Sequence, residues 1–120
     1  MKIMEQINYV EFPATNLAAT KAFFSRIFAW EFEDYGPEYS AFSNAGLAGG
    51  FYLSSQKSTT GQGAALIVLI TDNLEDSYEK VVAGGGHISK EIFSFPGGRR
   101  FHFIEPSGNE FAIWSHGESG

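Results

Sequence analysis

Three side chains of the sequence have the chemistry for acid–base catalysis or for binding a metal ion: Glu11, His102 and Glu110. Glu11 shares one face of a predicted strand with Tyr9, because side chains alternate along a strand. His102 lies between two phenylalanines and would point away from them. A carboxyl group in an apolar cleft acquires a raised pKa, so Glu11 or His102 could act as a general acid or base. Alternatively, Glu110 lies in solvent at a sheet edge and His102 is an ordinary polar strand residue.

Other catalytic chemistries have little support in this sequence. Cysteine is absent, which excludes a thiolate nucleophile, a disulfide framework and a thiolate metal site. No serine has a neighbouring His–Asp pattern. Gly84-Gly85-Gly86 follows a predicted helix, so these glycines are expected to cap that helix and not to cradle a phosphate. His87 and His116 are expected to face solvent.

Size and composition predict one globular domain over residues 1–120. Apolar residues make up 43% of the chain and twelve residues are Phe, which excludes a disordered chain. The formal charge of −6 argues against a nucleic-acid partner. No apolar run approaches the roughly 20 residues that span a membrane, and the first residues lack the apolar core of a signal peptide. We therefore expect a cytoplasmic protein with neither a nucleic-acid nor a membrane partner.

The first half of the chain predicts a strand, a helix and three strands. Pro13 is expected to end the first strand, because proline cannot donate to a strand ladder. Thr15 or Asn16 is expected to cap the helix. The predicted elements are a strand over 7–12, a helix to about Ala29, strands over 30–34, 39–43 and 49–54, and a polar loop over 55–63.

The second half repeats this order. Asn73-Leu74 follows Asn16-Leu17 by 57 positions (73 − 16), and Asp72 with Glu75 has the spacing of a capping box. The predicted elements are a strand over 65–70, a helix over about 73–83, and strands over 87–93, 100–104 and 110–115. The sequence thus predicts an α+β fold of two βαβββ modules, over about 5–55 and about 64–116.

Two such modules need each other. A half of about 55 residues cannot bury both faces of its sheet. We expect the helices to cover one face of each sheet, and the two opposite faces to wall one cleft. The expected lining of this ligand-binding cleft is Tyr9, Glu11, Phe51, Leu66, Val68, Arg100, His102, Ala112 and Trp114. The alternative is that these side chains fill a closed core.

Several motifs resemble one known family. They are Val10-Glu11-Phe12-Pro13-Ala14-Thr15-Asn16-Leu17, Ile27-Phe28-Ala29-Trp30-Glu31-Phe32, Thr71-Asp72-Asn73-Leu74, Gly84-Gly85-Gly86-His87 and Glu105-Pro106-Ser107-Gly108-Asn109-Glu110-Phe111. In this order and spacing they resemble the vicinal oxygen chelate superfamily of glyoxalase I, fosfomycin-resistance enzymes, extradiol dioxygenases and bleomycin-resistance proteins. The likeness is greatest to its glyoxalase-related branch. Ala29 stands where the family has glycine, and Glu105 where it has aspartate.

The resemblance implies a divalent metal held by His, Glu or Gln on the first and last strands of each module. The corresponding positions here are Tyr9, Leu66, Ala112 and one residue within 49–53. Leucine and alanine cannot coordinate a metal, and tyrosine alone holds one poorly. We therefore expect no metal and no other cofactor. A non-standard site made of Glu11, His102 and Glu110 remains the alternative.

Three functions follow from these observations. The first is a metal-independent, bleomycin-resistance-like protein that binds a small aromatic or cationic molecule. The second is a lyase- or isomerase-like enzyme with a non-standard metal site or with Glu11 or His102 as acid–base residue. The third is an association module, because the resemblance implies a homodimer whose modules pair within one chain or across the dimer.

Overall fold

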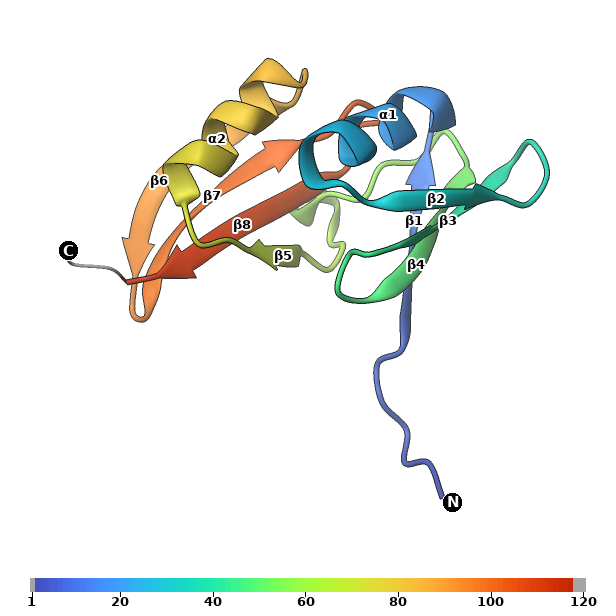
Figure 1. Cartoon of the computed structure of the whole chain (residues 1–120), viewed down its shortest axis with the longest axis horizontal. Helices are drawn as coiled ribbons and strands as arrows, with labels where there is room; N and C mark the ends of the chain where they lie inside the picture. Colours follow the sequence, from blue (N-terminus) through green and yellow to red (C-terminus); the bar gives the residue numbers. More distant parts are fainter. Residues whose placement is uncertain (1, 118–120) are drawn as a thin grey trace.

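In the computed structural model, which describes residues 2–117, the chain forms two modules with the same element order (Figure 1). This confirms the predicted α+β fold of two βαβββ modules. The first module contains β1 (Tyr9–Ala14), α1 (Leu17–Phe28), β2 (Glu31–Asp34), β3 (Tyr39–Ser43) and β4 (Ala48–Leu53). The second contains β5 (Ile67–Ile70), α2 (Leu74–Ala83), β6 (His87–Phe95), β7 (Gly98–Ile104) and β8 (Glu110–His116), and the 3-10 helix η1 (Thr60–Gln62) lies between the modules.

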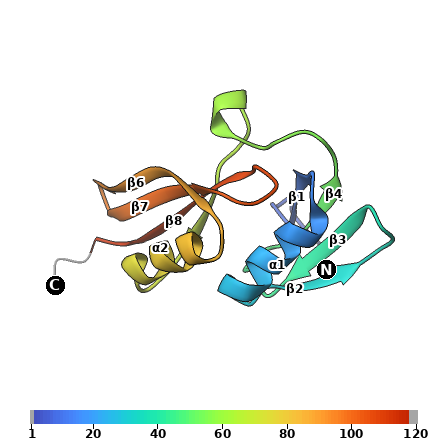
Figure 2. The same ribbon diagram turned by 90° about the horizontal axis from the view of Figure 1, so that it is seen from above.

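Each module folds into one four-stranded sheet. The strand orders are β1-β4-β3-β2 and β5-β8-β7-β6, so the first strand of each module runs beside its last. Both of these pairs are parallel, and they place Glu11 opposite Gly50 and Val68 opposite Ala112. The remaining pairs are antiparallel. Figure 2 shows the two modules side by side, with the linker that carries η1 passing between them.

The two helices begin with the same cap. The Asn16 side chain accepts a hydrogen bond from the backbone N–H of Ala19, and the Asn73 side chain accepts one from Asp76, both at 3.0 Å. Each cap satisfies one backbone donor of the first helical turn. The repeat predicted from these two asparagines is thus present in the geometry. The predicted capping box of Asp72 and Glu75 is wrong, because Asn73 is the capping residue.

Several predicted strand boundaries need correction. Pro13 does not end β1, which continues to Ala14 with Pro13 opposite Tyr52. Proline is tolerated there because β1 pairs only with β4, so its other edge needs no N–H donor. The hairpin of β6 and β7 is longer than predicted: β6 extends to Phe95 and β7 starts at Gly98.

One aromatic core joins the two modules. Phe24 of α1 lies 5.2 Å from Phe111 of β8 between ring centroids, and Phe12 of β1 lies 4.9 Å from the same ring. Phe23 of α1 lies 5.9 Å from Phe103 of β7. All five rings are buried. Helix α1 therefore packs against both sheets and holds their helix-facing sides in a single core.

A buried polar network also ties the modules together. The Glu105 carboxylate accepts hydrogen bonds from the Thr20 hydroxyl at 2.8 Å and from the Asn109 amide at 2.6 Å. The Asn109 amide also donates to the carbonyl oxygen of Pro13 at 2.6 Å. Burial raises the pKa of Glu105, although the hydrogen bonds from Ser107, Thr20 and Asn109 oppose that rise. The β7–β8 turn is thus fixed to the start of the first module.

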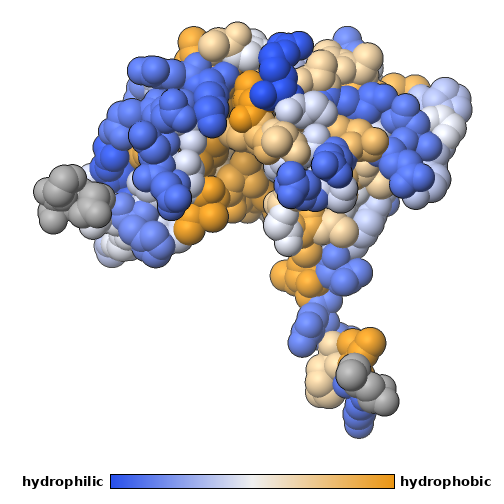
Figure 3. Space-filling view, viewed as in Figure 1, coloured by the Kyte–Doolittle hydropathy of each residue, from blue (hydrophilic) through white to orange (hydrophobic). Residues whose placement is uncertain are grey.

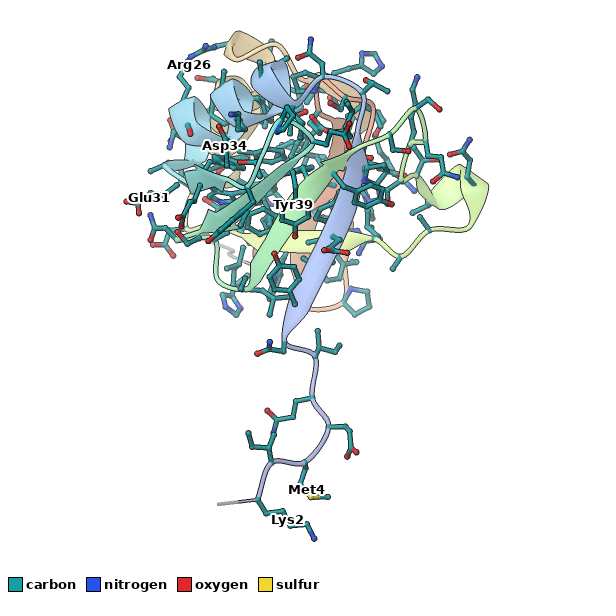
Figure 4. The ribbon with its side chains drawn as sticks, turned by 90° about the vertical axis from the view of Figure 1, so that its right-hand side faces the viewer. Lys2, Met4, Arg26, Glu31, Asp34 and Tyr39 are labelled. Atoms are coloured by element: carbon teal, nitrogen blue, oxygen red, sulfur yellow. The ribbon has the colours of Figure 1, made fainter. Side chains whose placement is uncertain are left out.

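The N-terminal residues 2–8 form neither helix nor strand and leave the body as an extended arm (Figures 1 and 4). Its apolar side chains are exposed, with Ile3 at 82% and Ile7 at 86% of their full accessibility. Figure 4 shows Met4 far from the body on this arm. Within residues 2–117, no helix is both long and apolar enough to cross a bilayer.

Candidate functional site

The face of the first sheet that lies opposite α1 carries a tyrosine–carboxylate chain. The Tyr39 hydroxyl donates to Glu11 at 2.9 Å, and the Tyr9 hydroxyl lies 2.5 Å from that of Tyr39. The Tyr39 ring end lies over Gly50, where any Cβ atom would overlap it. Burial raises the pKa of Tyr39, and the hydrogen bonds with Tyr9 and Glu11 raise it further. Glu11 therefore keeps its position through Tyr39, a partner that sequence reasoning missed.

Glu11 also lines a polar hollow of about 540 Å³ between β1, β4 and the linker. Pro13 and Tyr52 form its floor on the sheet side. The linker contributes Ser55, Gln56, Lys57, Ser58, Gln62 and Ala64. Carboxylate, hydroxyl, amide and ammonium groups thus line this hollow, so it can bind polar or charged groups.

The open face of the second sheet carries a histidine–glutamate pair. The imidazole Nδ1 of His102 lies 3.0 Å from Oε2 of Glu110, and the other carboxylate oxygen accepts from the backbone N–H and hydroxyl of Thr60, both at 2.8 Å. Burial would raise the pKa of Glu110, but the hydrogen bonds from His102 and Thr60 outweigh it, so the pKa is lowered. Glu110 is therefore an ionised partner of His102 and not the solvent-exposed edge residue of the alternative interpretation.

His102 shares this open face with Arg100, because Phe101 and Phe103 point into the core on the other side of β7. The register places Trp114 opposite Arg100 and Ala112 opposite His102, so the predicted residues of β7 and β8 occupy one face. Ala112 is completely buried. Among the described residues, Nε2 of His102 and Nε of Arg100 are buried without a hydrogen-bond partner.

A larger apolar groove lies between parts of the two modules, beside the core that joins them. Its volume is about 910 Å³, and Figure 3 shows it as a hollow apolar surface at the centre of the molecule. The C-terminal end of α1 and the β3–β4 turn form one wall. Leu66, Val68 and the rest of β5 form the other, together with Ser77 and Lys80 of α2. The groove thus runs along β5, at the edge of the second sheet.

The predicted cleft residues are therefore divided within one chain. Glu11 lies in the polar hollow and Leu66 and Val68 lie in the apolar groove, whereas His102 lines none of the hollows described above. Phe51 was expected in the cleft, and this prediction is wrong. It is fully buried in the core, with its ring 5.4 Å from Phe12. Side chains alternate along β4, so Tyr52 faces the open side in its place.

The positions of the expected metal ligands do not fit a divalent ion. Tyr9 is exposed and paired with Tyr39, Leu66 is apolar, and Ala112 is buried in its sheet. The register that pairs Val68 with Ala112 pairs Glu11 with Gly50, which identifies Gly50 as the fourth position. Over residues 2–117, no three His, Asp or Glu side chains gather closely enough to bind a metal.

The fold and motifs agree with a family model. The model of the Glyoxalase/Bleomycin resistance protein/Dioxygenase superfamily matches residues 6–113. The chain belongs to this superfamily. No curated protein matches the sequence. The superfamily assignment therefore rests on the family model and on the two βαβββ modules.

Solved structures of this superfamily show the same fold at low identity. A glyoxalase-related enzyme from Fulvimarina pelagi is 18% identical, with a TM-score of 0.77, and the match covers 94% of this chain and 89% of that one. The fosfomycin resistance protein FosX from Listeria monocytogenes is 19% identical, with a TM-score of 0.77 and 94% of both chains covered. Lactoylglutathione lyase from Agrobacterium tumefaciens is 16% identical, with a TM-score of 0.70, and the match covers 95% and 96% of the two chains.

Proposed function

We propose that this chain is a cytoplasmic small-molecule-binding protein of the glyoxalase/bleomycin-resistance type, which binds its ligand without the metal of its enzymatic relatives. The observation that carries this proposal is the content of the metal-ligand positions. Tyr9, Leu66, Gly50 and Ala112 offer one phenol and no imidazole or carboxylate. Aromatic and polar groups nevertheless remain on both open faces, as in small-molecule pockets generally.

We also propose that the binding protein is a homodimer. The β1 and β5 strands each have one unpaired edge, and such edges readily add a strand from another chain. The arm, which leads into β1, has exposed apolar side chains, and Ile70 of β5 is 62% exposed. In a two-fold dimer, the arm and β1 of one copy would pair with β5 of the other, and each contact would occur twice.

Such pairing would complete the ligand cleft. The open face with Glu11 in one copy would then lie against the open face with His102 in the other copy. Within one chain these two faces are separate. The carboxylate of Glu11 would suit a cationic group of the ligand, and the aromatic side chains would suit a flat one. Buried apolar groove surface would stabilise the dimer at about 25 cal/mol per Å².

The second candidate function is a lyase- or isomerase-like enzyme. The pairing of His102 with an ionised Glu110 favours it, because a carboxylate that fixes one imidazole nitrogen leaves the other to exchange protons with a substrate. Here His102 would be the acid–base residue and Glu110 its positioning residue. If the His102→Gln variant loses turnover of a substrate but binds that substrate with unchanged affinity, the result favours the enzyme over the binding protein.

Two measurements test the primary proposal. Thermal unfolding with a panel of small aromatic, anionic and cationic compounds should show a stabilising compound, because a ligand that binds the folded state raises the melting temperature. Elemental analysis of the purified protein should show less than one divalent metal ion per chain. A melting temperature that no compound of the panel raises would contradict ligand binding. A stoichiometric metal ion that the His102→Gln variant loses would contradict metal independence.

A further inference from the structure

Basic side chains gather around one aromatic ring on the open face of the second sheet. The Nζ atom of Lys90 lies 4.8 Å from the ring centroid of Phe93, and the guanidinium carbon of Arg100 lies 5.2 Å from it. The His102 ring lies 6.0 Å from the same ring. Lys90 is the strand partner of His102, and Phe93 is that of Arg100. One phenylalanine is thus surrounded by two cations and an imidazole.

A β-bulge brings these groups together. The pairing of β6 with β7 shifts register between Lys90 and Phe93, opposite the stretch from Arg100 to His102. A bulge places an extra residue on one strand, bends it and turns its side chains in new directions. Here it allows Lys90 and Phe93 to approach Arg100 from the neighbouring strand. The sheet backbone itself therefore positions the cluster.

The positive charge of this cluster is not neutralised within the described chain. Neither Lys90 nor Arg100 forms an ion pair with a described carboxylate. The neighbouring Arg99, on the opposite face, pairs with Glu75 at 2.6 Å. The chain has 14 acidic and only 8 basic residues, so two cations without a carboxylate partner at one ring are unexpected. Two like charges near one ring repel each other, and a bound anion would remove that repulsion.

The same face carries the buried atoms without partners. Nε of Arg100 and Nε2 of His102 have no hydrogen-bond partner among the described residues, and His102 is only 6% exposed. A buried polar group left unpaired loses its hydrogen bonds to water without replacement, so such groups are rare in folded proteins. Glu110 already fixes Nδ1 of His102, so the imidazole forms a fixed, buried neighbour of the two cations. Both of these unpaired nitrogen atoms belong to side chains on the same face of β7.

Aromatic rings flank the cations. Arg100 also lies 5.5 Å from the Phe95 ring, and Phe95 lies 6.0 Å from Trp114. Phe95, Arg100 and Trp114 are only partly buried and Lys90 is exposed, so a ligand can reach them. Flat apolar groups pack well against such rings. This surface thus combines cations, which can bind an oxyanion, with an apolar wall of aromatic rings.

We propose that Lys90 and Arg100 form a subsite for the oxyanion group of a small organic acid, a carboxylate or phosphoryl group, and that Phe93, Phe95 and Trp114 pack against its flat apolar part. Guanidinium groups bind such oxyanions through paired hydrogen bonds, and the lysine adds a further charge. This subsite rests on the proposed small-molecule-binding function and specifies the chemical class of the ligand.

Four naphthalene compounds with the same ring test the subsite: 1-naphthoate, 1-naphthyl phosphate, 1-naphthamide and 1-naphthylmethylammonium. NMR titration of the purified full chain would follow the backbone signals of residues 90–102 and the imidazole signals of His102. We expect the carboxylate or the phosphate to bind at least about tenfold more tightly than the amide, as charge-assisted hydrogen bonds imply. The preferred member of that pair distinguishes a carboxylate from a phosphoryl ligand.

Matched variants locate the effect. Arg100→Gln should weaken binding of the oxyanion about tenfold, and Arg99→Gln, one residue away on the opposite face, should leave it unchanged. Arg100→Lys keeps the charge and should recover part of the affinity. The dispersion of the NMR spectra reports whether each variant is folded.

Three results would overturn the subsite. They are equal affinity for the amide and the oxyanions, an equal loss of oxyanion affinity in the Arg99→Gln and Arg100→Gln variants, or no oxyanion binding at millimolar concentration. Exclusive binding of the ammonium compound would overturn the subsite and keep the small-molecule-binding function. Failure of that function itself would show in the broader melting panel.

Discussion

The Nδ1 atom of His102 lies 3.0 Å from a carboxylate oxygen of Glu110 on the neighbouring strand. Thr60 of the linker holds the other oxygen with two hydrogen bonds of 2.8 Å. The imidazole therefore has a fixed orientation, and its Nε2 atom is turned away from the carboxylate. A loop far away in sequence thus fixes the polar group at the centre of the second open face.

This pair should make stability depend on pH through Glu110. Its pKa in the folded chain lies below the ordinary value of 4.5, so the folded state keeps Glu110 ionised where the unfolded chain takes up a proton. The stabilisation is therefore present above about pH 4.5 and is lost as the pH falls through the folded pKa. Glu110→Gln should cost about 1–2 kcal/mol of unfolding free energy at pH 7, and the difference from wild type should shrink below pH 4.5.

Urea unfolding at pH 7 and at several values down to pH 3 measures this difference. Glu79→Gln, at an exposed position of α2, is the control and should change stability little at either end. An undiminished gap between wild type and Glu110→Gln at pH 3 would mean that the cost of the substitution is not the loss of the charge.

The fold was accessible from the sequence because local signals repeat. The Asn16 and Asn73 caps, each followed by leucine, mark equivalent helix starts. Alternation around Phe101 and Phe103 was enough to orient Arg100 and His102. These signals act over a few residues, so the sequence alone reveals them.

The missed features depend on contacts between distant segments. In the strand around Phe51, glycines and two aromatic residues show no alternation between polar and apolar side chains. The buried face is decided by the packing of Phe51 against Phe12, Phe24 and Phe42, which come from other elements. The contact of Thr60 with Glu110 depends on the path of a polar linker. The cluster around Phe93 needs a β-bulge, which has no residue signature here.

Replacing Ala29 by glycine should stabilise the protein. Ala29 ends α1 with a φ of 61°, in the left-handed region that costs a residue with a Cβ atom about 1 kcal/mol. Ala29→Gly should therefore gain up to about 1 kcal/mol, despite the greater flexibility of glycine in the unfolded chain. Ala22→Gly, at an exposed position inside the same helix, should lose about as much. Thermal or urea unfolding of both variants checks the opposite signs, and a loss in both would contradict the cap interpretation.

A methyl group at Gly50 should displace Tyr39 from Glu11. The added Cβ would overlap the end of the Tyr39 side chain, so the ring has to move away. We expect Gly50→Ala to cost no more than about 1 kcal/mol of stability while the pKa of Tyr39 returns toward its ordinary value of 10.0, because burial and the contacts with Tyr9 and Glu11 are lost. NMR of tyrosine ring carbons during alkaline titration measures this pKa. Gly61→Ala has open space around it and should leave Tyr39 unchanged.

A charge on the free edge of β5 should separate the proposed dimer. Ile70 is exposed on this edge and lines the apolar groove, so pairing with a second copy would bury it. Ile70→Lys would place a charge in that interface and should convert dimers to monomers at micromolar concentration, since an unpaired buried charge is strongly unfavourable. Deleting residues 2–8 should have the same effect, because the arm is the other half of the proposed contact.

Light scattering coupled to size-exclusion chromatography measures both masses. Val82→Lys introduces the same charge at an exposed apolar position of α2, outside the proposed interface, and should remain dimeric. If ligand binding needs the open faces of two copies, the monomeric variants should also lose it while keeping their folded spectra. A wild-type chain that is monomeric at all concentrations would contradict the dimer. Monomeric variants that bind as tightly as wild type would show that one chain forms the binding site alone.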